Sequence, residues 1–216
     1  MPVFNLSEYA SVGTTYINEM RDVQIQKDRL RFRKNLERLG EVLAYEVSKS
    51  LQYEQVQIQT PLGVATSFGL VQQPVLATIL RAGLPMYYGF LEVFDRAESA
   101  FSGAYRGQHK EDYTFEITTD YLAAPRLEGR PLILIDPMLA TGKSLLATYK
   151  LLQAHGQPAQ VHIAVALASN QGISFIEKNL PDAFIWAGAI DAELNQKSYI
   201  VPGLGDAGDL CFGGKS

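Results

Sequence analysis

The segment PLILIDPMLATGKS, residues 131–144, carries the strongest fold signal in the chain. Its apolar run at residues 132–135 is typical of a strand buried on both faces of a parallel sheet. Asp136 follows directly, and residues 141–144 lead into a helical stretch at residues 145–154. Ligands of open α/β sheets bind beyond the carboxyl ends of the strands, and a helix start suits a phosphate. This order predicts a ligand site, with an ordinary turn as the alternative.

The end of this segment partly matches the phosphate-binding loop of nucleotide hydrolases, G-x-x-x-x-G-K-S/T. Gly142, Lys143 and Ser144 fit the pattern, but Pro137 stands where the first glycine is required. Because proline fixes φ and has no N–H group, the loop cannot wrap a polyphosphate in the usual way. A nucleotide hydrolase or kinase is therefore kept only as an alternative, which nucleotide turnover without a sugar donor would support.

Length and composition favour one globular domain, residues 1–216, in the cytoplasm. Hydrophobic residues make up 47% and charged residues 19%, as in ordinary soluble proteins. No apolar stretch approaches the about 20 residues that span a bilayer, and the N-terminus lacks the pattern of a signal peptide. The single cysteine, Cys211, excludes an internal disulfide, and a net charge of −4 argues against general nucleic-acid binding.

Strands alternate with helices along the chain, which predicts a parallel sheet with right-handed crossovers. Residues 1–20 show no clear period, and the N-terminal residues, 1–25, are expected to form an arm or a docked tail, whereas the glycine-rich residues 197–216 are expected to be largely loop. Predicted helices cover residues 28–51, 84–94, 145–154 and 172–179. Predicted strands cover residues 55–60 and 64–67, which form a hairpin, and residues 74–80, 97–105, 111–120, 132–135, 161–167 and 183–190.

Charged side chains follow three of the predicted strands. Arg81, Arg106 and Asp136 each come at or directly after a strand end. Because the carboxyl ends of parallel strands meet at one edge of a sheet, we expect these residues to lie close together. Two cations and one acid beside a glycine-containing helix start indicate a polyanionic ligand that also bears hydroxyl groups.

The segment at residues 21–38 is locally basic, with seven Lys and Arg residues against three acidic ones. Its functional interpretation is anion or RNA binding. The favoured interpretation is a solvated or subunit-facing helix face, since charge on an exposed face is the norm.

The tail contains a second informative motif, YIVPGLGDAGD, at residues 199–209. Glycines at positions 203, 205 and 208 remove side chains where the backbone must approach a partner closely. Exposed backbone N–H and C=O groups in such a loop can recognise a small planar molecule by its donors and acceptors. Asp206, within the loop, is a candidate ligand for a hydroxyl group or a metal ion.

Taken together, DPMLATG, ILRAG and YIVPGLGDAGD resemble the motifs of the uracil phosphoribosyltransferases, from about Arg21 to the C-terminus. The resemblance implies the type I phosphoribosyltransferase fold. In this α/β fold, helices flank a central, mostly parallel sheet, with a β-hairpin arm and a small C-terminal hood at residues 191–216. It also implies a pentosyltransferase that moves ribose 5-phosphate from phosphoribosyl pyrophosphate (PRPP) to N1 of uracil, giving UMP and pyrophosphate.

The resemblance also assigns residues and partners. It implies catalytic roles for Arg106, Asp136 and Asp206, and a uracil site at Ile200, Gly205, Asp206 and Ala207. PRPP would contact Arg81, Arg106, Asp136, Pro137, Met138, Leu139, Ala140, Thr141, Gly142, Lys143, Ser144 and Asp206. Mg²⁺ is expected with PRPP rather than at a separate protein site. A homodimer or higher homo-oligomer, GTP as an effector, and no membrane partner are further expectations.

The sequence departs from the family pattern at two positions. Lys143 stands where glycine is usual, and Leu210 stands where a basic residue is usual. An RNA-binding regulator of pyrimidine genes on the same fold, with weak or no transferase activity, is the alternative function. Retention on RNA at moderate salt would support it, since phosphate contacts weaken steeply with salt.

Overall fold

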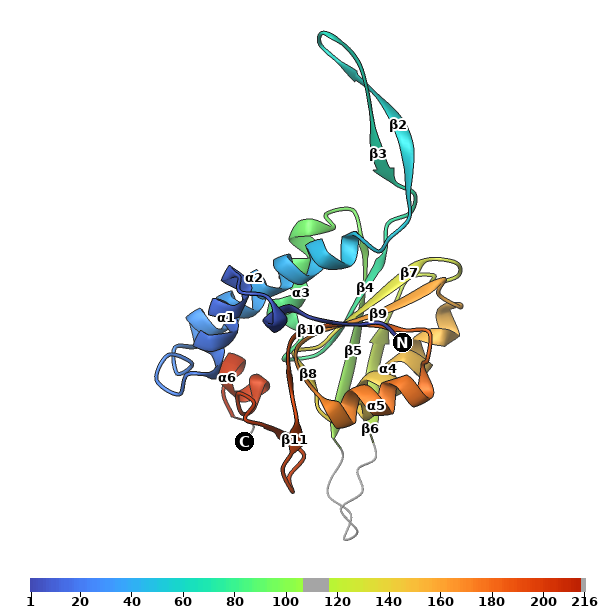
Figure 1. Cartoon of the computed structure of the whole chain (residues 1–216). Helices are drawn as coiled ribbons and strands as arrows, with labels where there is room; N and C mark the ends of the chain where they lie inside the picture. Colours follow the sequence, from blue (N-terminus) through green and yellow to red (C-terminus); the bar gives the residue numbers. More distant parts are fainter. Residues whose placement is uncertain (107–116, 215–216) are drawn as a thin grey trace.

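A mostly parallel sheet forms the centre of the protein in the computed structural model (Figure 1), which describes residues 1–106 and 117–214, with backbone alone at 104–106 and 117–120. In these residues the strand order is β1-β10-β9-β7-β4-β5-β6, and β8 also pairs with β9. All of these pairings are parallel except that of β5 with β6. The strands are β1 (Val3–Asn5), β4 (Val75–Ile79), β5 (Glu98–Arg106), β6 (Ile117–Ala123), β7 (Pro131–Ile135), β8 (Met138–Leu139), β9 (Gln160–Ser169) and β10 (Phe184–Asp191).

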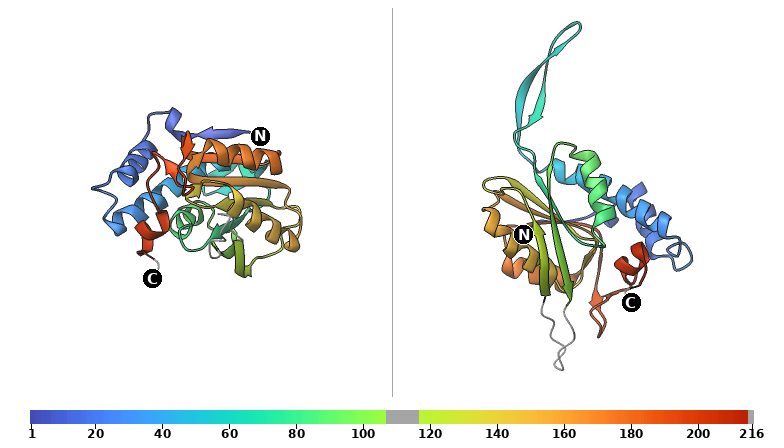
Figure 2. Two further views of the ribbon diagram at one scale, coloured as in Figure 1. Left: turned by 90° about the horizontal axis from the view of Figure 1, so that it is seen from below. Right: turned by 180° about the vertical axis from the view of Figure 1, so that it is seen from behind.

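Helices cover both faces of this sheet (Figure 2), which confirms the predicted α/β fold. One face carries α1 (Val12–Arg21), α2 (Arg29–Ser48) and α3 (Leu84–Val93); the other carries α4 (Lys143–Leu152) and α5 (Asn170–Asn179). The sequence of strand β7 is continuously apolar because both of its faces are buried. Ile133 and Ile135 join the core under α1, α2 and α3, whereas Leu132 and Leu134 join the core under α4 and α5.

The N-terminal residues are part of the sheet and of the core. Strand β1 pairs with β10, and a short 3₁₀ helix, Leu6–Glu8, leads toward α1. Leu6, Ile17 and Met20 are buried against α2 and the sheet. The three strand residues and the single turn are too short to show a period, and α1 buries only Gly13, Ile17 and Met20, so the pattern of residues 1–20 gave no element.

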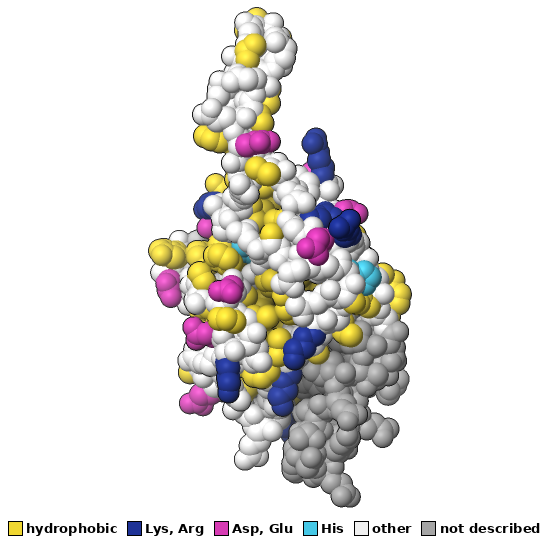
Figure 3. All heavy atoms as spheres, turned by 90° about the vertical axis from the view of Figure 1, so that its right-hand side faces the viewer, with side chains coloured by type: hydrophobic (Ala, Val, Ile, Leu, Met, Phe, Trp, Pro, Cys, Tyr) yellow, Lys and Arg dark blue, Asp and Glu magenta, His cyan; other side chains and the backbone are white. Residues whose placement is uncertain are grey.

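The predicted hairpin is present and projects from the body at the end opposite the C-terminal segment (Figure 1). Its strands are β2 (Tyr53–Thr60) and β3 (Gly63–Leu70), paired antiparallel as a separate sheet. Hydrophobic side chains lie along it on the surface (Figure 3), and Leu62 at its tip is 101% exposed. This hairpin is the β-hairpin arm that the family resemblance implied.

The strand predicted at residues 111–120 is present from Ile117, where β6 runs to Ala123, and residues 107–116 lie outside the described part of the chain. The described tail after residue 197 is mostly loop, as expected, but it also contains β12 (Ile200–Val201), which pairs with β11 (Glu193–Leu194), and the helix α6 (Ala207–Phe212). Helix α6 forms because Asp206 caps its first turn and because Ala207 and Cys211 are buried.

The remaining element is a second 3₁₀ turn, Gln153–His155, after α4. None of the described helices combines the length and apolar character needed to cross a membrane.

Two leucines of α2 provide a test of the core. Leu39 is 0% exposed and Leu30 is 62% exposed on the same helix. We expect Leu39→Ala to lower the free energy of unfolding by about 2–5 kcal/mol, because it removes buried methyl groups and leaves a cavity. Leu30→Ala, the matched control with the same change in helix propensity, should stay within about 0.5 kcal/mol of wild type. Urea denaturation measures both; equal losses would contradict the assigned burial.

Candidate active site

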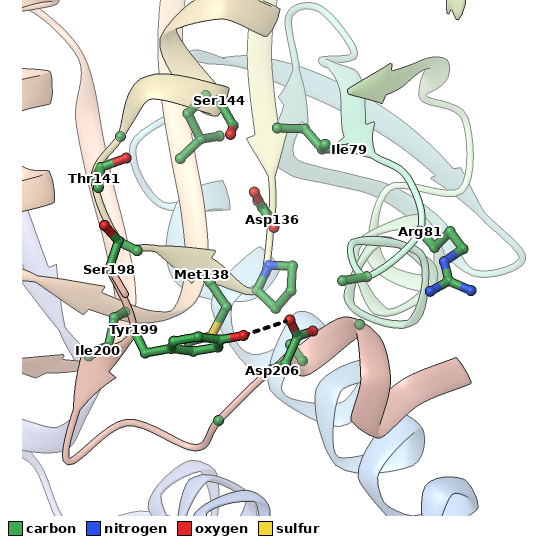
Figure 4. Close-up of a pocket in the computed structure, with 18 of the residues that line it drawn as sticks. Ile79, Arg81, Asp136, Met138, Thr141, Ser144, Ser198, Tyr199, Ile200 and Asp206 are labelled. Atoms are coloured by element: carbon green, nitrogen blue, oxygen red, sulfur yellow. Dashed lines mark hydrogen bonds between the residues drawn. The ribbon is translucent and has the colours of Figure 1, made fainter. Parts of the chain in front are cut away.

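The candidate site lies at the carboxyl edge of the sheet, where β4 and β7 are hydrogen-bonded parallel neighbours. Arg81 follows the end of β4 and Asp136 follows the end of β7. Both line a pocket of about 260 Å³ (Figure 4). Arg106 ends β5, the neighbour of β4 on its other side, but its side chain is outside the described part of the chain. The pocket therefore joins two of the three charges that follow predicted strands.

Most of the predicted ligand residues line this one pocket. They come from ILRAG, from the loop after β7 and from the tail: Arg81, Asp136, Pro137, Met138, Ala140, Thr141, Gly142, Ser144, Ile200, Gly205, Asp206 and Ala207. Leu139 is one exception, because its side chain is fully buried in the core under α4 and α5. Lys143 begins α4 with an exposed side chain and does not line the pocket.

The loop after β7 is held by two backbone hydrogen bonds and one side-chain hydrogen bond to β9. The amide of Asp136 donates to the carbonyl of Ala164 at 3.2 Å, and the amide of Leu167 donates to the carbonyl of Pro137 at 2.9 Å. The hydroxyl of Ser169 donates to the carbonyl of Ala140 at 2.6 Å. These bonds fix the path of the loop, so that it reaches the first turn of α4 in one defined conformation.

Gly142 makes the sharp change of direction into α4. Its φ is 76°, in the left-handed region that glycine adopts without a steric cost. A Cβ atom there would also lie 2.8 Å from Cδ1 of Phe175 on α5. The first N–H groups of a helix have no partner within the helix, so this turn presents donors beside Thr141 and Ser144. An anionic group of a ligand fits at this position.

Arg81 lies across the pocket from Thr141 and Ser144 in Figure 4. The Leu80–Arg81 peptide bond is cis. The guanidinium carbon of Arg81 lies 6.0 Å from the centre of the Phe212 ring on α6. Behind the pocket, the hydroxyl of Thr78 donates to the carbonyl of Ile135 at 3.1 Å and ties the end of β4 to the end of β7.

The tail forms the remaining wall. The hydroxyl of Tyr199 donates to Oδ2 of Asp206 at 3.5 Å (Figure 4). Oδ1 of Asp206 accepts from the amide of Asp209 at 3.1 Å. Ser198 and Tyr199 line the pocket, although the prediction from sequence did not include them. Tyr199 opens the YIVPGLGDAGD motif, so its place in that motif was a signal that could have identified it.

The chemistry of the pocket is that of binding rather than of covalent catalysis. Its described lining offers an arginine, two carboxylates and several hydroxyl groups, without a histidine or a cysteine. Cys211 lies in α6, and burial raises the pKa of its thiol to about 12, so it is a neutral packing group at physiological pH. Among the described residues, no three His, Cys, Asp or Glu side chains gather as a metal site. The arrangement suits a phosphorylated, hydroxyl-bearing ligand.

Comparison with known proteins identifies the family. The model of the uracil phosphoribosyltransferase family matches residues 13–214. The chain belongs to the uracil phosphoribosyltransferase family. Over all 216 residues of both chains, it is 49% identical to the uracil phosphoribosyltransferase of Porphyromonas gingivalis.

Solved structures share the fold of this chain. A protein from Aquifex aeolicus is 32% identical and covers 98% of each chain, with a TM-score of 0.86. A hypoxanthine phosphoribosyltransferase from Staphylococcus aureus shares the fold, with a TM-score of 0.50, 16% identity and coverage of 75% of this chain and 76% of its own. The expected fold of the type I phosphoribosyltransferases is therefore confirmed.

Proposed function

We propose that this protein transfers the 5-phosphoribosyl group of PRPP to N1 of uracil, giving UMP and pyrophosphate in pyrimidine salvage. One observation carries the proposal: the loop at residues 136–144 and the tail at residues 198–208 line the same pocket. A phosphate-binding turn and a loop with exposed backbone groups are thereby brought together. Membership of the uracil phosphoribosyltransferase family supports the identity of the base.

In this proposal, PRPP lies along the carboxyl edge of the sheet. Asp136 accepts hydrogen bonds from the ribose hydroxyls, and the backbone N–H groups at residues 140–144 bind the 5′-phosphate. Lys143 and Leu139 take part only through their backbone. The side chain of Lys143 is exposed outside the pocket, and that of Leu139 is buried in the core. Arg81 and Arg106 hold the pyrophosphate, since a guanidinium pairs with two phosphate oxygens and stays charged.

Uracil binds against the tail in this arrangement. Gly205 lines the pocket with a φ of 95° and open space where a Cβ would be, so no side chain at this position stands between its backbone and a ligand. Backbone donors and acceptors at Ile200, Gly205 and Ala207 would match N3–H and the carbonyl oxygens of the base. The carboxylate of Asp206 lies between this wall and the sugar side, where it can also reach the donor.

The reaction needs positioning more than covalent help. The bond from C1 of the ribose to the pyrophosphate oxygen breaks, the bond from C1 to N1 of uracil forms, and the N1 proton is released. The sugar passes through a cationic, oxocarbenium-like state. Arginines on the leaving group and carboxylates near the sugar stabilise this charge separation, and the shared pocket aligns N1 with C1.

Mg²⁺ would enter with PRPP. The pocket fits such an ion, because Asp136 and Asp206 supply two carboxylates, and Mg²⁺ is usually held by one or two carboxylates together with substrate phosphates and water. When bound, the ion neutralises charge on the leaving pyrophosphate. We also propose a cytoplasmic location, as expected from the composition, and sensitivity to GTP, as the family resemblance implied.

The α2 helix gives the RNA-binding alternative no support. Arg31 bonds Glu19 at 2.9 and 2.5 Å, and this hydrogen bond lowers the pKa of Glu19. Arg33 donates to the carbonyl of Cys211 at 2.7 Å, and Lys34 bonds Glu37. Three of the cations that suggested an RNA site are therefore engaged within the chain.

We propose a homodimer in which the β2–β3 hairpin packs on a second copy. Residues 53–70 contain one charged residue, Glu54, and expose Ile58, Leu62, Val64 and Phe68 by 47%, 101%, 64% and 70%. An exposed apolar patch of this kind marks an interaction surface.

Product formation tests the activity. Incubation with PRPP and Mg²⁺ should convert uracil to UMP, whereas cytosine should react up to about 10⁴-fold more slowly, because a site that hydrogen-bonds a substrate group rejects analogues lacking it. Chelation of Mg²⁺ and addition of GTP in the same assay test those two expectations. A folded sample that makes no UMP at saturating substrates would refute the function, and comparable rates with cytosine would refute the assigned base recognition.

Replacement of one carboxylate tests the PRPP site. We expect Asp136→Asn to lower kcat/KM for PRPP ten-fold or more, about 1.4 kcal/mol, because an amide accepts hydroxyl protons less well than a carboxylate. Asp182→Asn makes the same chemical change at an exposed position outside the pocket and should leave the kinetics unchanged. Unchanged PRPP kinetics in Asp136→Asn would show that Asp136 only ends its strand.

Light scattering tests the assembly. The wild-type protein should have twice the chain mass of 23.9 kDa, and Phe68→Glu should shift it toward the monomer by placing a charge in the apolar contact. Leu151→Glu, at a 40% exposed leucine of α4, is the matched control and should leave the mass unchanged. A monomeric wild type would contradict the dimer.

A further inference from the structure

An ion pair joins the end of α1 to the end of β10, two elements that do not line the pocket. Nη1 and Nη2 of Arg21 donate to Oδ2 and Oδ1 of Asp191, both at 2.8 Å. Arg21 is the last residue of α1, and Asp191 is the last residue of β10. A bidentate pair of this kind has one preferred geometry, so it fixes direction as well as distance.

The same two side chains also hold the peptide groups of one tail residue. The amide of Gly203 donates to Oδ2 of Asp191 at 2.9 Å, and Nη1 of Arg21 donates to the carbonyl of Gly203 at 3.0 Å. Both backbone groups of Gly203 are therefore satisfied by the pair. We call Arg21, Asp191 and Gly203 the tail clamp.

Gly203 is the point at which the tail turns toward the pocket. Its φ is 58°, and a Cβ atom would lie 2.1 Å from the carbonyl of Ile200, so the turn has no room for another residue. Its neighbour Leu204 is 5% exposed and packs in the core. Gly205 and Asp206 follow at once and line the pocket. The clamp therefore sets where the backbone enters the proposed base site.

The two charged side chains of the clamp are mostly buried, so their hydrogen bonds hold them in one geometry. Asp191 is 8% exposed, and the side chain of Arg21 is 22% exposed. A buried ion pair is weak evidence for stability, because the desolvation penalty offsets much of the attraction, but its hydrogen bonds restrict geometry strongly. Positioning of the tail backbone is a role that these contacts can fulfil without touching substrate.

The tail and the loop at residues 136–142 are held by different residues on neighbouring strands. Asp191 of β10 lies opposite Ser169 of β9, and Ser169 donates to the carbonyl of Ala140. One residue at the sheet edge thus holds the tail, and its neighbour holds the loop at residues 136–142. A defect in the clamp should therefore act mainly on binding of the base, and on binding of the donor only through Asp206.

We propose that Arg21 and Asp191 are positioning residues that hold the Gly203 turn, and with it the backbone groups that recognise the nucleobase. This inference rests on the proposed function. In Arg21→Lys, one amine keeps the charge but cannot make all three bonds at once. In Asp191→Asn, the amide keeps the shape but loses charge and one acceptor.

Steady-state kinetics measure the effect on each substrate separately. We expect both variants to raise KM for uracil ten-fold or more, with KM for PRPP changed less than three-fold. Arg31→Lys is the matched control, because it breaks another bidentate arginine–carboxylate pair, with Glu19, that lies between α2 and α1 away from the tail. That control should leave both KM values unchanged, even where thermal unfolding shows a similar loss of stability.

Hydrogen exchange supplies a readout that does not depend on turnover. In Arg21→Lys, the amides at residues 199–206 should exchange at least ten-fold faster, whereas those at residues 136–144 should exchange at the wild-type rate. An equal rise of both KM values, an unchanged KM for uracil, or unaltered exchange in the tail would overturn the proposal.

The outcomes separate the two proposals. A wild-type protein that makes no UMP would refute the proposed activity, and in that case the exchange data alone decide whether the clamp orders the tail. Loss of the fold in both Arg21→Lys and Asp191→Asn, with Arg31→Lys intact, would show that the pair is a stability element and would also overturn the positioning role.

Discussion

Parallel pairing of β4, β7 and β9 is the constraint on which the site depends. Because these strands run in the same direction, their carboxyl ends lie at one edge of the sheet. The strands alone therefore bring Arg81 and Asp136 to the same pocket. The buried hydroxyl of Thr78 locks the ends of β4 and β7 together through the carbonyl of Ile135. The loops beyond that edge can then be irregular, since the sheet already places their first residues.

Sequence patterns were sufficient where an element is long and buried on one or both faces. The apolar runs of β4, β7 and β9 and the helical spacing of α2 predicted a parallel sheet flanked by helices, although not the order of its strands. Asp136 was predictable because it directly follows a buried strand. Short elements were not predictable: β1 has three residues, and α6 has six, so both depend on neighbours far away in the chain.

The parts of the site that escaped prediction arise from long-range packing. Tyr199 lines the pocket only because β12 pairs back on β11 and returns the tail to the sheet edge. Arg21 and Asp191 are separated by 170 positions, and no spacing rule links a residue at the end of α1 with one at the end of β10. Leu210 also has a structural explanation, because it packs against the core in place of the basic residue that the family pattern has there.

Separate anchoring of the two loops on neighbouring strands has an evolutionary consequence. Ser169 holds the loop at residues 136–142 and Asp191 holds the tail, so the two segments do not share a supporting side chain. In the proposed function, substitutions in the tail can therefore alter base recognition while the loop assigned to the sugar phosphate stays in place. A protein built in this way can evolve toward another nucleobase by changes in the tail alone, while the loop at residues 136–142 stays the same.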